Sequence, residues 1–203
     1  MTGPIGRAIV CARRADGLSA GAIRIDNPFR GPAAVTSDST FDIRPTRPED
    51  IDQVAAIYAI EVSTGKASFE IVPPDAAQMR ERFERVTGAG YSHLVACRGQ
   101  DILGYAYTSE YRPRPAYRFT VEDSVYVRRD ARGLGVATAL LTALIDDCRG
   151  KPFRQMIAVI GDSANAASIR LHERLGFSTV GVLRRVGYKF DQWIDTVIMQ
   201  REL

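Results

Sequence analysis

The 203-residue chain has few of the side chains that cross-link a protein or bind a metal. Its three cysteines, Cys11, Cys97 and Cys148, are odd in number, far apart and without a CxxC pair, which argues against a disulfide framework or a zinc site. His93 and His172 are the only histidines, too few for a histidine-based metal cluster. We therefore expect no metal, three small buried thiols and a cytoplasmic location.

Long apolar runs and an excess of one charge are also missing. No apolar stretch reaches the roughly eighteen residues of a membrane-spanning helix, so we expect no membrane partner. The 27 basic and 24 acidic residues nearly balance, and the net charge of +3 is not typical of a nucleic-acid-binding protein. The composition, 45% hydrophobic and 25% charged, indicates a globular protein, and the length indicates one domain.

Residues 1–40 differ from the rest of the chain. Glycine and proline recur through them without a hydrophobic period, and the apolar run at 9–12 is too short for a secretory signal. We predict an N-terminal extension that is disordered, or that is translated from an early start codon; a basic targeting tail is the alternative. The folded domain is predicted over residues 41–203.

From residue 41 the hydrophobic pattern predicts an α+β domain in the order β-α-α-β-β-β-α-β-α-β-β. Thr46 and Glu49 have the spacing of a capping box for the first helix, and Asp75 has the position of an N-cap for the second. The later elements are expected as a hairpin at 93–111, a strand at 119–127, a helix at 137–148, a buried strand at 156–160, a helix at 165–177 and two final strands within 180–203.

The segment VYVRRDARGLGVAT, residues 125–138, passes from a strand pattern through charges and glycines into a helical pattern. Gly133 and Gly135 allow a ligand to approach the backbone, and free N–H groups at a helix start favour phosphate. A turn that merely requires positive φ is the alternative. A nucleoside triphosphate loop needs a Gly-Lys-Ser/Thr sequence, and a dinucleotide loop needs a third glycine where Thr138 stands. The third candidate is the pyrophosphate of coenzyme A.

The sequence Arg132-x-x-Gly135-x-Ala137 resembles the acyl-CoA loop of the GNAT N-acetyltransferase superfamily. The resemblance covers residues 41–203. It implies a GNAT-like fold, a mixed and mostly antiparallel twisted sheet flanked by helices. It also implies that acyl-CoA is bound at the strand-to-helix corner.

Three further segments, 120–127, 165–177 and 186–195, resemble the branch of phosphinothricin and methionine-sulfoximine acetyltransferases. This resemblance implies an enzyme that moves acetyl directly from acetyl-CoA to the α-amino group of a small amino acid analogue. It also implies a homodimer. A protein or peptide N-acetyltransferase and a non-catalytic acyl-CoA-binding module are the alternatives.

The resemblance assigns roles to individual residues. Glu122 is the expected general base, with a surface carboxylate, or one paired with Arg118, as the alternative. His172 is expected to protonate the leaving thiolate or to hydrogen-bond near sulfur, or else it is a packed helix residue. Asn165 is expected on the pantetheine arm, or only as a helix N-cap. The cofactor-binding residues implied are Val125, Tyr126, Val127, Arg132, Gly133, Leu134, Gly135, Val136, Ala137, Thr138 and Asn165.

The Arg- and Pro-rich loop at 112–118 is interpreted as part of the acceptor site, with a purely exposed loop as the alternative. Arginine side chains there suit a carboxylate or a phosphinate, and the prolines stiffen the loop. Lys189 and Trp193 are expected at the site or at a dimer face. The substrate-binding residues predicted are Arg112, Pro113, Arg114, Tyr117 and Glu122, with Tyr117 or Phe119 as a wall.

Overall fold

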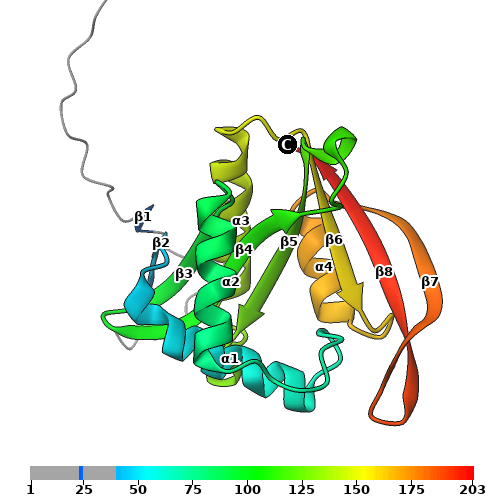
Figure 1. The fold of residues 1–203 in the computed structure, drawn as a ribbon, viewed down its shortest axis with the longest axis horizontal. Coiled ribbons are helices and arrows are strands. Elements are labelled where there is room, and N and C mark those ends of the chain that lie inside the picture. Colours follow the sequence, from blue (N-terminus) through cyan, green and yellow to red (C-terminus); the bar gives the residue numbers. More distant parts are fainter. Residues whose placement is uncertain (1–22, 25–39) are drawn as a thin grey trace, which may run out of the picture.

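The structure, a computed structural model, describes residues 23–24 and 40–203. In these residues a single sheet has the strand order β1-β2-β3-β4-β5-β6-β8-β7 (Figure 1). Neighbouring strands are antiparallel, except that β5 and β6 are parallel. The strands are β1 Ile23–Arg24, β2 Asp42–Pro45, β3 His93–Arg98, β4 Asp101–Glu110, β5 Thr120–Val127, β6 Gln155–Gly161, β7 Ser178–Lys189 and β8 Gln192–Glu202.

Helices cover both faces of the sheet (Figure 1). The helices are α1 Ile51–Thr64, α2 Ala76–Gly88, α3 Val136–Arg149 and α4 Ala166–Arg174, with short 3-10 turns η1 Pro48–Asp50, η2 Pro115–Tyr117 and η3 Arg129–Ala131. The order of elements predicted from residue 41 onward is confirmed. The predicted N-terminal extension lies outside the described residues, apart from Ile23–Arg24, which pair with β2.

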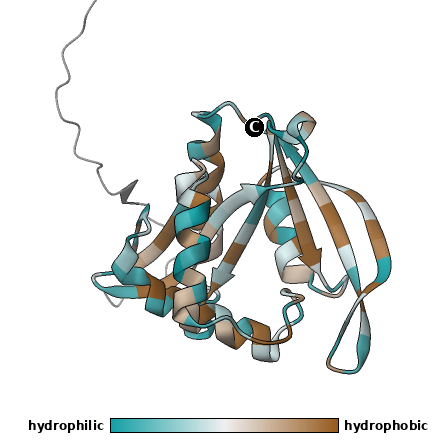
Figure 2. Cartoon of the chain, in the orientation of Figure 1, coloured by the Kyte–Doolittle hydropathy of each residue, from teal (hydrophilic) through white to brown (hydrophobic). Residues whose placement is uncertain are grey.

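Two buried clusters lie on opposite faces of the sheet. One packs α1 and α2 on β3 and β4, through residues such as Val54, Phe83 and Tyr105. The other packs α3 and α4 on the central strands and includes Leu140 and Met156. Figure 2 shows brown segments along β6 and β8, whereas the outward side of α2 is mainly teal. None of the described helices is long and apolar enough to cross a membrane.

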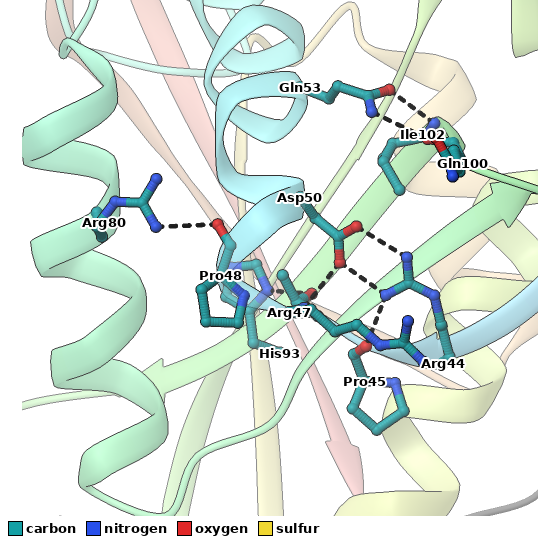
Figure 3. Close-up of polar contacts among 11 residues, drawn as sticks. Arg44, Pro45, Arg47, Pro48, Asp50, Gln53, Arg80, His93, Gln100 and Ile102 are labelled. Carbon is teal, nitrogen blue, oxygen red and sulfur yellow. Dashed lines mark hydrogen bonds and ion pairs between the residues drawn. The ribbon is translucent and has the colours of Figure 1, made fainter.

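The start of α1 differs from the prediction. The Thr46 hydroxyl does not cap the helix, because it lies 2.8 Å from Nδ1 of the buried His93. Instead Asp50 accepts a hydrogen bond from the Arg47 backbone N–H and two from Arg44, at 2.7, 2.6 and 2.8 Å (Figure 3). The predicted capping box of Thr46 and Glu49 is therefore wrong. The Thr46 hydroxyl forms its hydrogen bond with His93, which is 47 residues away in the sequence.

The parallel pair β5–β6 opens into a wedge. Its paired residues run only from Thr120 opposite Gln155 to Asp123 opposite Ala158. Beyond them β5 continues alongside β4, and β6 continues alongside β8. Figure 1 shows the two strands diverging toward their carboxyl ends. The backbone of β5 that faces β6 is thus left without a strand partner, beginning at Ser124.

Candidate active site

The glycine corner follows β5 at the wide end of the wedge. Gly133 and Gly135 have φ of +78° and +83°, a left-handed conformation that is strained for other residues. Gly135 is the N-cap of α3, so the N–H groups of the first helical turn point out of the helix end. The turn requires positive φ, and the N–H groups at the start of the helix are donors of the kind that an anion accepts from.

The arginines of the corner are not equally available. Arg128 is held by Asp101 and Asp130 at 2.5 and 2.7 Å, so its charge is largely neutralised. Arg129 donates to the Thr64 hydroxyl at 2.6 Å. The Arg132 side chain is 57% exposed and has only a long contact, 3.5 Å, to Glu61. Among these three, Arg132 is therefore the cation best placed to meet a phosphate.

A groove of about 710 Å³ begins at the corner and runs into the wedge. Residues of α1, of the loop 65–67, of β5 and of α4 line it, as does each predicted cofactor residue except Leu134. Leu134 is exposed beside the groove. A smaller hollow of about 50 Å³ continues the groove to the apex of the wedge, at Asp123 and His172.

The shape and the donors of this groove fit coenzyme A. A pyrophosphate suits the positive φ glycines and the helix start, and an extended arm suits the unpaired edge of β5. Asn165 lines both the groove and the hollow, while its side-chain oxygen accepts a hydrogen bond from the Ser168 N–H at 3.2 Å. It caps α4, and its amide N–H₂ is not used in that bond.

Glu122 lies near the apex of the wedge, one residue before the strands separate. Its neighbours Val121 and Asp123 are buried toward α3 and α4, so the Glu122 side chain faces the α1–α2 side of the sheet. Burial and the adjacent charge of Asp123 raise the pKa of Glu122 to about 7, although Arg112 lowers it in part. A carboxyl with this pKa is suited to accept a proton at neutral pH.

His172 is a buried residue of α4, and it lines the hollow at the apex of the wedge. Its Nε2 is 3.1 Å from Asp123 Oδ2, and its Nδ1 is 2.8 Å from the Ser168 carbonyl oxygen. Burial tends to lower the pKa of His172, but the hydrogen bond and charge of Asp123, together with the Ser168 carbonyl, raise it. Asp123 was missed from the sequence, because an acidic residue in an alternating strand gives no sign of a partner on a helix 49 residues away.

The loop predicted to bind the acceptor is exposed. Arg112 is near enough to Glu122 for its charge to lower the pKa of that carboxyl. The Tyr117 ring packs edge-on against Tyr111, with ring centroids 5.7 Å apart. The Arg118 guanidinium lies 4.2 Å from the centre of the Phe119 ring, and it forms no ion pair with Glu122 in the described residues. The loop thus brings the charge of Arg112 near Glu122.

A second cavity, of about 740 Å³, lies between α2 and the strands β3 and β4. Ser109 lines this cavity and is directly opposite Glu122 in the β4–β5 register, so the cavity lies close to Glu122. The polar residues around it include Glu70, Arg82, Arg85, Tyr107 and Glu110. No local pattern in the sequence predicts this cavity, because its walls come from helix and strand faces that meet only in the fold.

Lys189 and Trp193 occupy different environments. Lys189 is buried, and its Nζ donates to the carbonyl oxygens of Gly65 and Ser68 at 2.9 and 2.7 Å. It is therefore committed to holding the loop after α1. Trp193 is 63% exposed on the β7–β8 hairpin. No group of three His, Cys, Asp or Glu side chains in the described part of the chain is arranged to hold a metal.

A mostly antiparallel sheet that opens beside a glycine corner, with a carboxyl near the apex of the opening, defines the class of the protein as a transferase of the acetyltransferase fold. The sequence matches the Acetyltransferase (GNAT) family over residues 54–177. The chain belongs to this family. The predicted fold class and the predicted superfamily are therefore confirmed.

Within this family the chain is similar to several amino acid acetyltransferases. A phosphinothricin N-acetyltransferase of Alcaligenes faecalis is 55% identical over 161 residues, which cover 79% of this chain and 82% of that protein. An L-methionine sulfoximine/L-methionine sulfone acetyltransferase of Pseudomonas paraeruginosa is 41% identical over 162 residues, 79% of this chain and 94% of that protein. A phosphinothricin acetyltransferase of Sinorhizobium meliloti, crystallised with AcCoA, has a TM-score of 0.78 and 43% identity, covering 80% of this chain and 88% of that one.

Proposed function

We propose that the protein is an acetyltransferase that moves acetyl from acetyl-CoA directly to the α-amino group of a small amino acid analogue. The observation that carries this proposal is the position of Glu122. It is adjacent to Asp123, which lines the hollow that continues the cofactor groove, and it is opposite Ser109, which lines the second cavity. Arg112 lies near enough for its charge to lower the pKa of Glu122. The activities named for the relatives, on phosphinothricin and on methionine sulfoximine or sulfone, support the class of acceptor.

The cofactor half of the site is assigned from the groove. Residues 133–138 hold the pyrophosphate with backbone N–H groups, and Arg132 adds a positive charge. Val125, Tyr126 and Val127 present their backbone edge to the pantetheine arm as an added strand would, and Asn165 offers its free amide N–H₂. When bound, acetyl-CoA supplies the acetyl group as an activated thioester.

Glu122 performs the base chemistry. The amino group of an α-amino acid is an ammonium ion at neutral pH and has no lone pair for attack. Glu122 accepts a proton from it, directly or through one water molecule, because the pKa of the carboxyl is raised to about 7. A surface carboxyl of ordinary pKa would be a weaker base by more than two units of pKa, as the reference value of about 4.3 shows.

The acceptor is held by the loop and the second cavity. Arg112, beside Glu122, pairs with the α-carboxylate, which is one carbon away from the amine in any α-amino acid. The side chain of the acceptor then extends past Ser109 into the second cavity, where Arg85 is available to a phosphinate or sulfone oxygen. Arg114, Pro113 and Tyr117 shape the exposed rim.

The test is thiol release from acetyl-CoA across a panel of acceptors: phosphinothricin, methionine sulfoximine, methionine sulfone, ordinary amino acids and short peptides. We expect turnover on one or more of the amino acid analogues and a loss of about a hundredfold or more in Glu122→Gln. Glu202→Gln, the same change at an exposed position of β8, serves as the control and should keep full activity. Turnover only on peptides would move the function to protein acetylation, and coenzyme A binding without turnover would favour a binding module.

We also propose that the protein acts in the cytoplasm as a homodimer. The buried thiols Cys97 and Cys148 suit a reducing compartment. Exposed apolar side chains of the β7–β8 hairpin support the dimer. They are Val180, Val182, Leu183, Val186, Tyr188 and Trp193. Sedimentation equilibrium should give twice the mass of the chain, and Val186→Glu should shift it toward the monomer; a wild-type monomer at micromolar concentration would contradict this proposal.

A further inference from the structure

The buried pair Asp123–His172 is not explained by a simple base-and-acid assignment. Asp123 and His172 are 6% and 2% exposed, so both belong to the interior. A buried carboxylate and imidazole are retained only when the hydrogen bonds between them offset the loss of hydration. Their contact, Nε2 to Oδ2 at 3.1 Å, joins β5 to α4 across the apex of the wedge.

The partners of the imidazole determine its protonation. A carbonyl oxygen only accepts hydrogen bonds, so the 2.8 Å contact with Ser168 requires a proton on Nδ1. The carboxylate of Asp123 likewise requires a proton on Nε2. Both ring N–H groups are therefore in use. With Asp123 ionised, His172 in this arrangement is an imidazolium, and both of its ring protons are in these two hydrogen bonds.

The remaining oxygen of the carboxylate has no such partner. Asp123 Oδ1 is buried and makes no hydrogen bond among the described residues. Asp123 and His172 both line the small hollow at the apex of the wedge, into which the groove for the cofactor runs. A buried, unpartnered oxygen beside that hollow indicates that the pair is built to meet a ligand there.

The other groups around His172 leave Asp123 as its charged partner. Glu122 points to the opposite face of the sheet, and β6 contributes the apolar residues Ala158, Val159 and Ile160 to the hollow. Phe177 packs edge-on against the imidazole, with ring centroids 4.9 Å apart. On α4 itself Glu173 and Arg174 are the adjacent charges, and neither contacts the ring by hydrogen bond or ion pair in the described residues.

We propose that Asp123 is a positioning residue that holds His172 as a doubly protonated imidazolium beside the apex of the wedge, and that this fixed charge stabilises the thiolate of departing coenzyme A without giving up a proton. The inference rests on the proposed acetyl transfer. It assigns a role to Asp123, and it replaces proton donation by His172 with electrostatic stabilisation.

The protons balance without His172. The amine nitrogen forms a bond to the thioester carbonyl carbon, the carbon–sulfur bond breaks, and its electron pair stays on sulfur. One proton of the original ammonium goes to Glu122 and then to water. The second N–H proton lost as the amide forms goes to the thiolate, so the products are amide and thiol. His172 keeps both of its protons from start to finish.

The first test is nitrogen-15 NMR of the two histidines in the free protein. It measures the protonation of the rings and needs no turnover. At pH 7 both ring nitrogens of His172 should have the shifts of a protonated imidazolium, whereas His93 should be neutral. In Asp123→Asn the titration midpoint of His172 should move to lower pH, because burial remains while the negative charge is gone. A single neutral tautomer in the wild type, or an unmoved midpoint in the variant, would overturn the proposal.

The second test is the pH dependence of kcat. Asp123→Asn should lower kcat by about tenfold or more with KM for acetyl-CoA nearly unchanged, and it should add a fall in rate on the alkaline side as His172 loses its proton. Asp147→Asn, the same change in a carboxylate of α3 that lies 2.9 Å from Lys151, is the matched control and should change neither kcat nor its pH dependence. In the wild type the same fall should lie at the higher His172 midpoint that the NMR titration gives, and a kcat that does not follow the charge of His172 would overturn the proposal. If no acceptor is turned over at all, the proposed function fails while the NMR result still stands.

Discussion

At the scale of single residues, three titratable groups have surroundings that push their pKa values in different directions. Burial raises the pKa of Glu122 to about 7, and it lowers that of His93 to about 4. His172 is as buried as His93, yet its pKa is raised because Asp123 contacts it. Burial alone therefore does not predict a protonation state; the contact partner decides it.

The Glu122 carboxyl should be visible in the pH profile of the enzyme. A base must be deprotonated to act, so kcat/KM with an amino acid analogue should rise with pH through an apparent pKa of about 7. In Glu122→Gln that inflection should disappear, and the remaining rate should follow only the ionisation of the acceptor amine. Initial rates from pH 5.5 to 9 in a constant ionic-strength buffer measure this. A wild-type profile without an inflection near 7 would contradict a general base of raised pKa at this position.

His93 should make the folded state sensitive to acid. Its pKa is about 4 in the fold against an ordinary value of 6.5, because burial disfavours the charged ring, with slight opposition from Asp50. Between these values the unfolded chain binds more protons, so the stabilisation is complete above pH 6.5 and is lost as the pH falls toward 4. Urea unfolding at pH 7 and pH 5 should show a smaller pH dependence in His93→Asn than in the wild type. The variant should also lose about 0.5–3 kcal/mol at pH 7, because the His93 ring packs against both Tyr105 and Tyr107. Equal pH dependence in both proteins would assign the acid sensitivity elsewhere.

At the scale of elements, the sequence was informative wherever local pattern decides the structure. The sequence predicts the helix at 165–177 because Asn165 opens it and Gly176 closes it. The structure has α4 from Ala166 to Arg174, with Gly176 at φ +83°. The glycine corner was found because positive φ selects glycine. The start of α1 was wrong because Thr46 pairs with His93, a contact between elements that no local rule contains. Asp123 and the second cavity were missed for the same reason.

The glycine corner offers a matched pair of substitutions. A Cβ added at Gly133 or at Gly88 would meet no atom within 4 Å, but only Gly133 has a positive φ, +78°. Gly133→Ala should therefore lose about 1–2 kcal/mol of unfolding free energy, the strain of a left-handed L-residue. Gly88→Ala, at the end of α2, should be neutral or more stable by up to about 1 kcal/mol.

Calorimetry with coenzyme A separates strain from ligand contact at this corner. The Kd of coenzyme A should rise in Gly133→Ala and stay unchanged in Gly88→Ala, because only the first methyl group lies on the approach to the backbone N–H groups. Equal affinity in both variants would place the pyrophosphate away from residue 133.

At the scale of the whole molecule, the groove is closed on one side by contacts between distant parts of the chain. The loop after α1 supplies Gly65, Lys66 and Ala67 to the groove, and the β7–β8 hairpin holds that loop in place. Lys189 Nζ donates to two of its carbonyl oxygens, and Lys66 Nζ lies 2.9 Å from Gln192 Oε1. The C-terminal hairpin thus contributes to the cofactor site without touching the glycine corner, since it fixes the opposite wall.

Lys189→Met tests this coupling, because methionine keeps most of the side-chain volume and removes the donor. The carbonyl oxygens of Gly65, which is half-buried, and Ser68, which is buried, lose their partner, so we expect a loss of about 1–3 kcal/mol of unfolding free energy. Hydrogen exchange should become faster in residues 65–72 while α3 and its corner stay protected, and the Kd of coenzyme A should rise severalfold. Lys151 pairs with Asp147 at the C-terminal end of α3. Lys151→Met should therefore change neither the exchange rates of residues 65–72 nor the Kd of coenzyme A. Exchange that is unchanged at 65–72 in Lys189→Met would mean that the loop holds its shape through its own contacts, and the groove would then be independent of the hairpin.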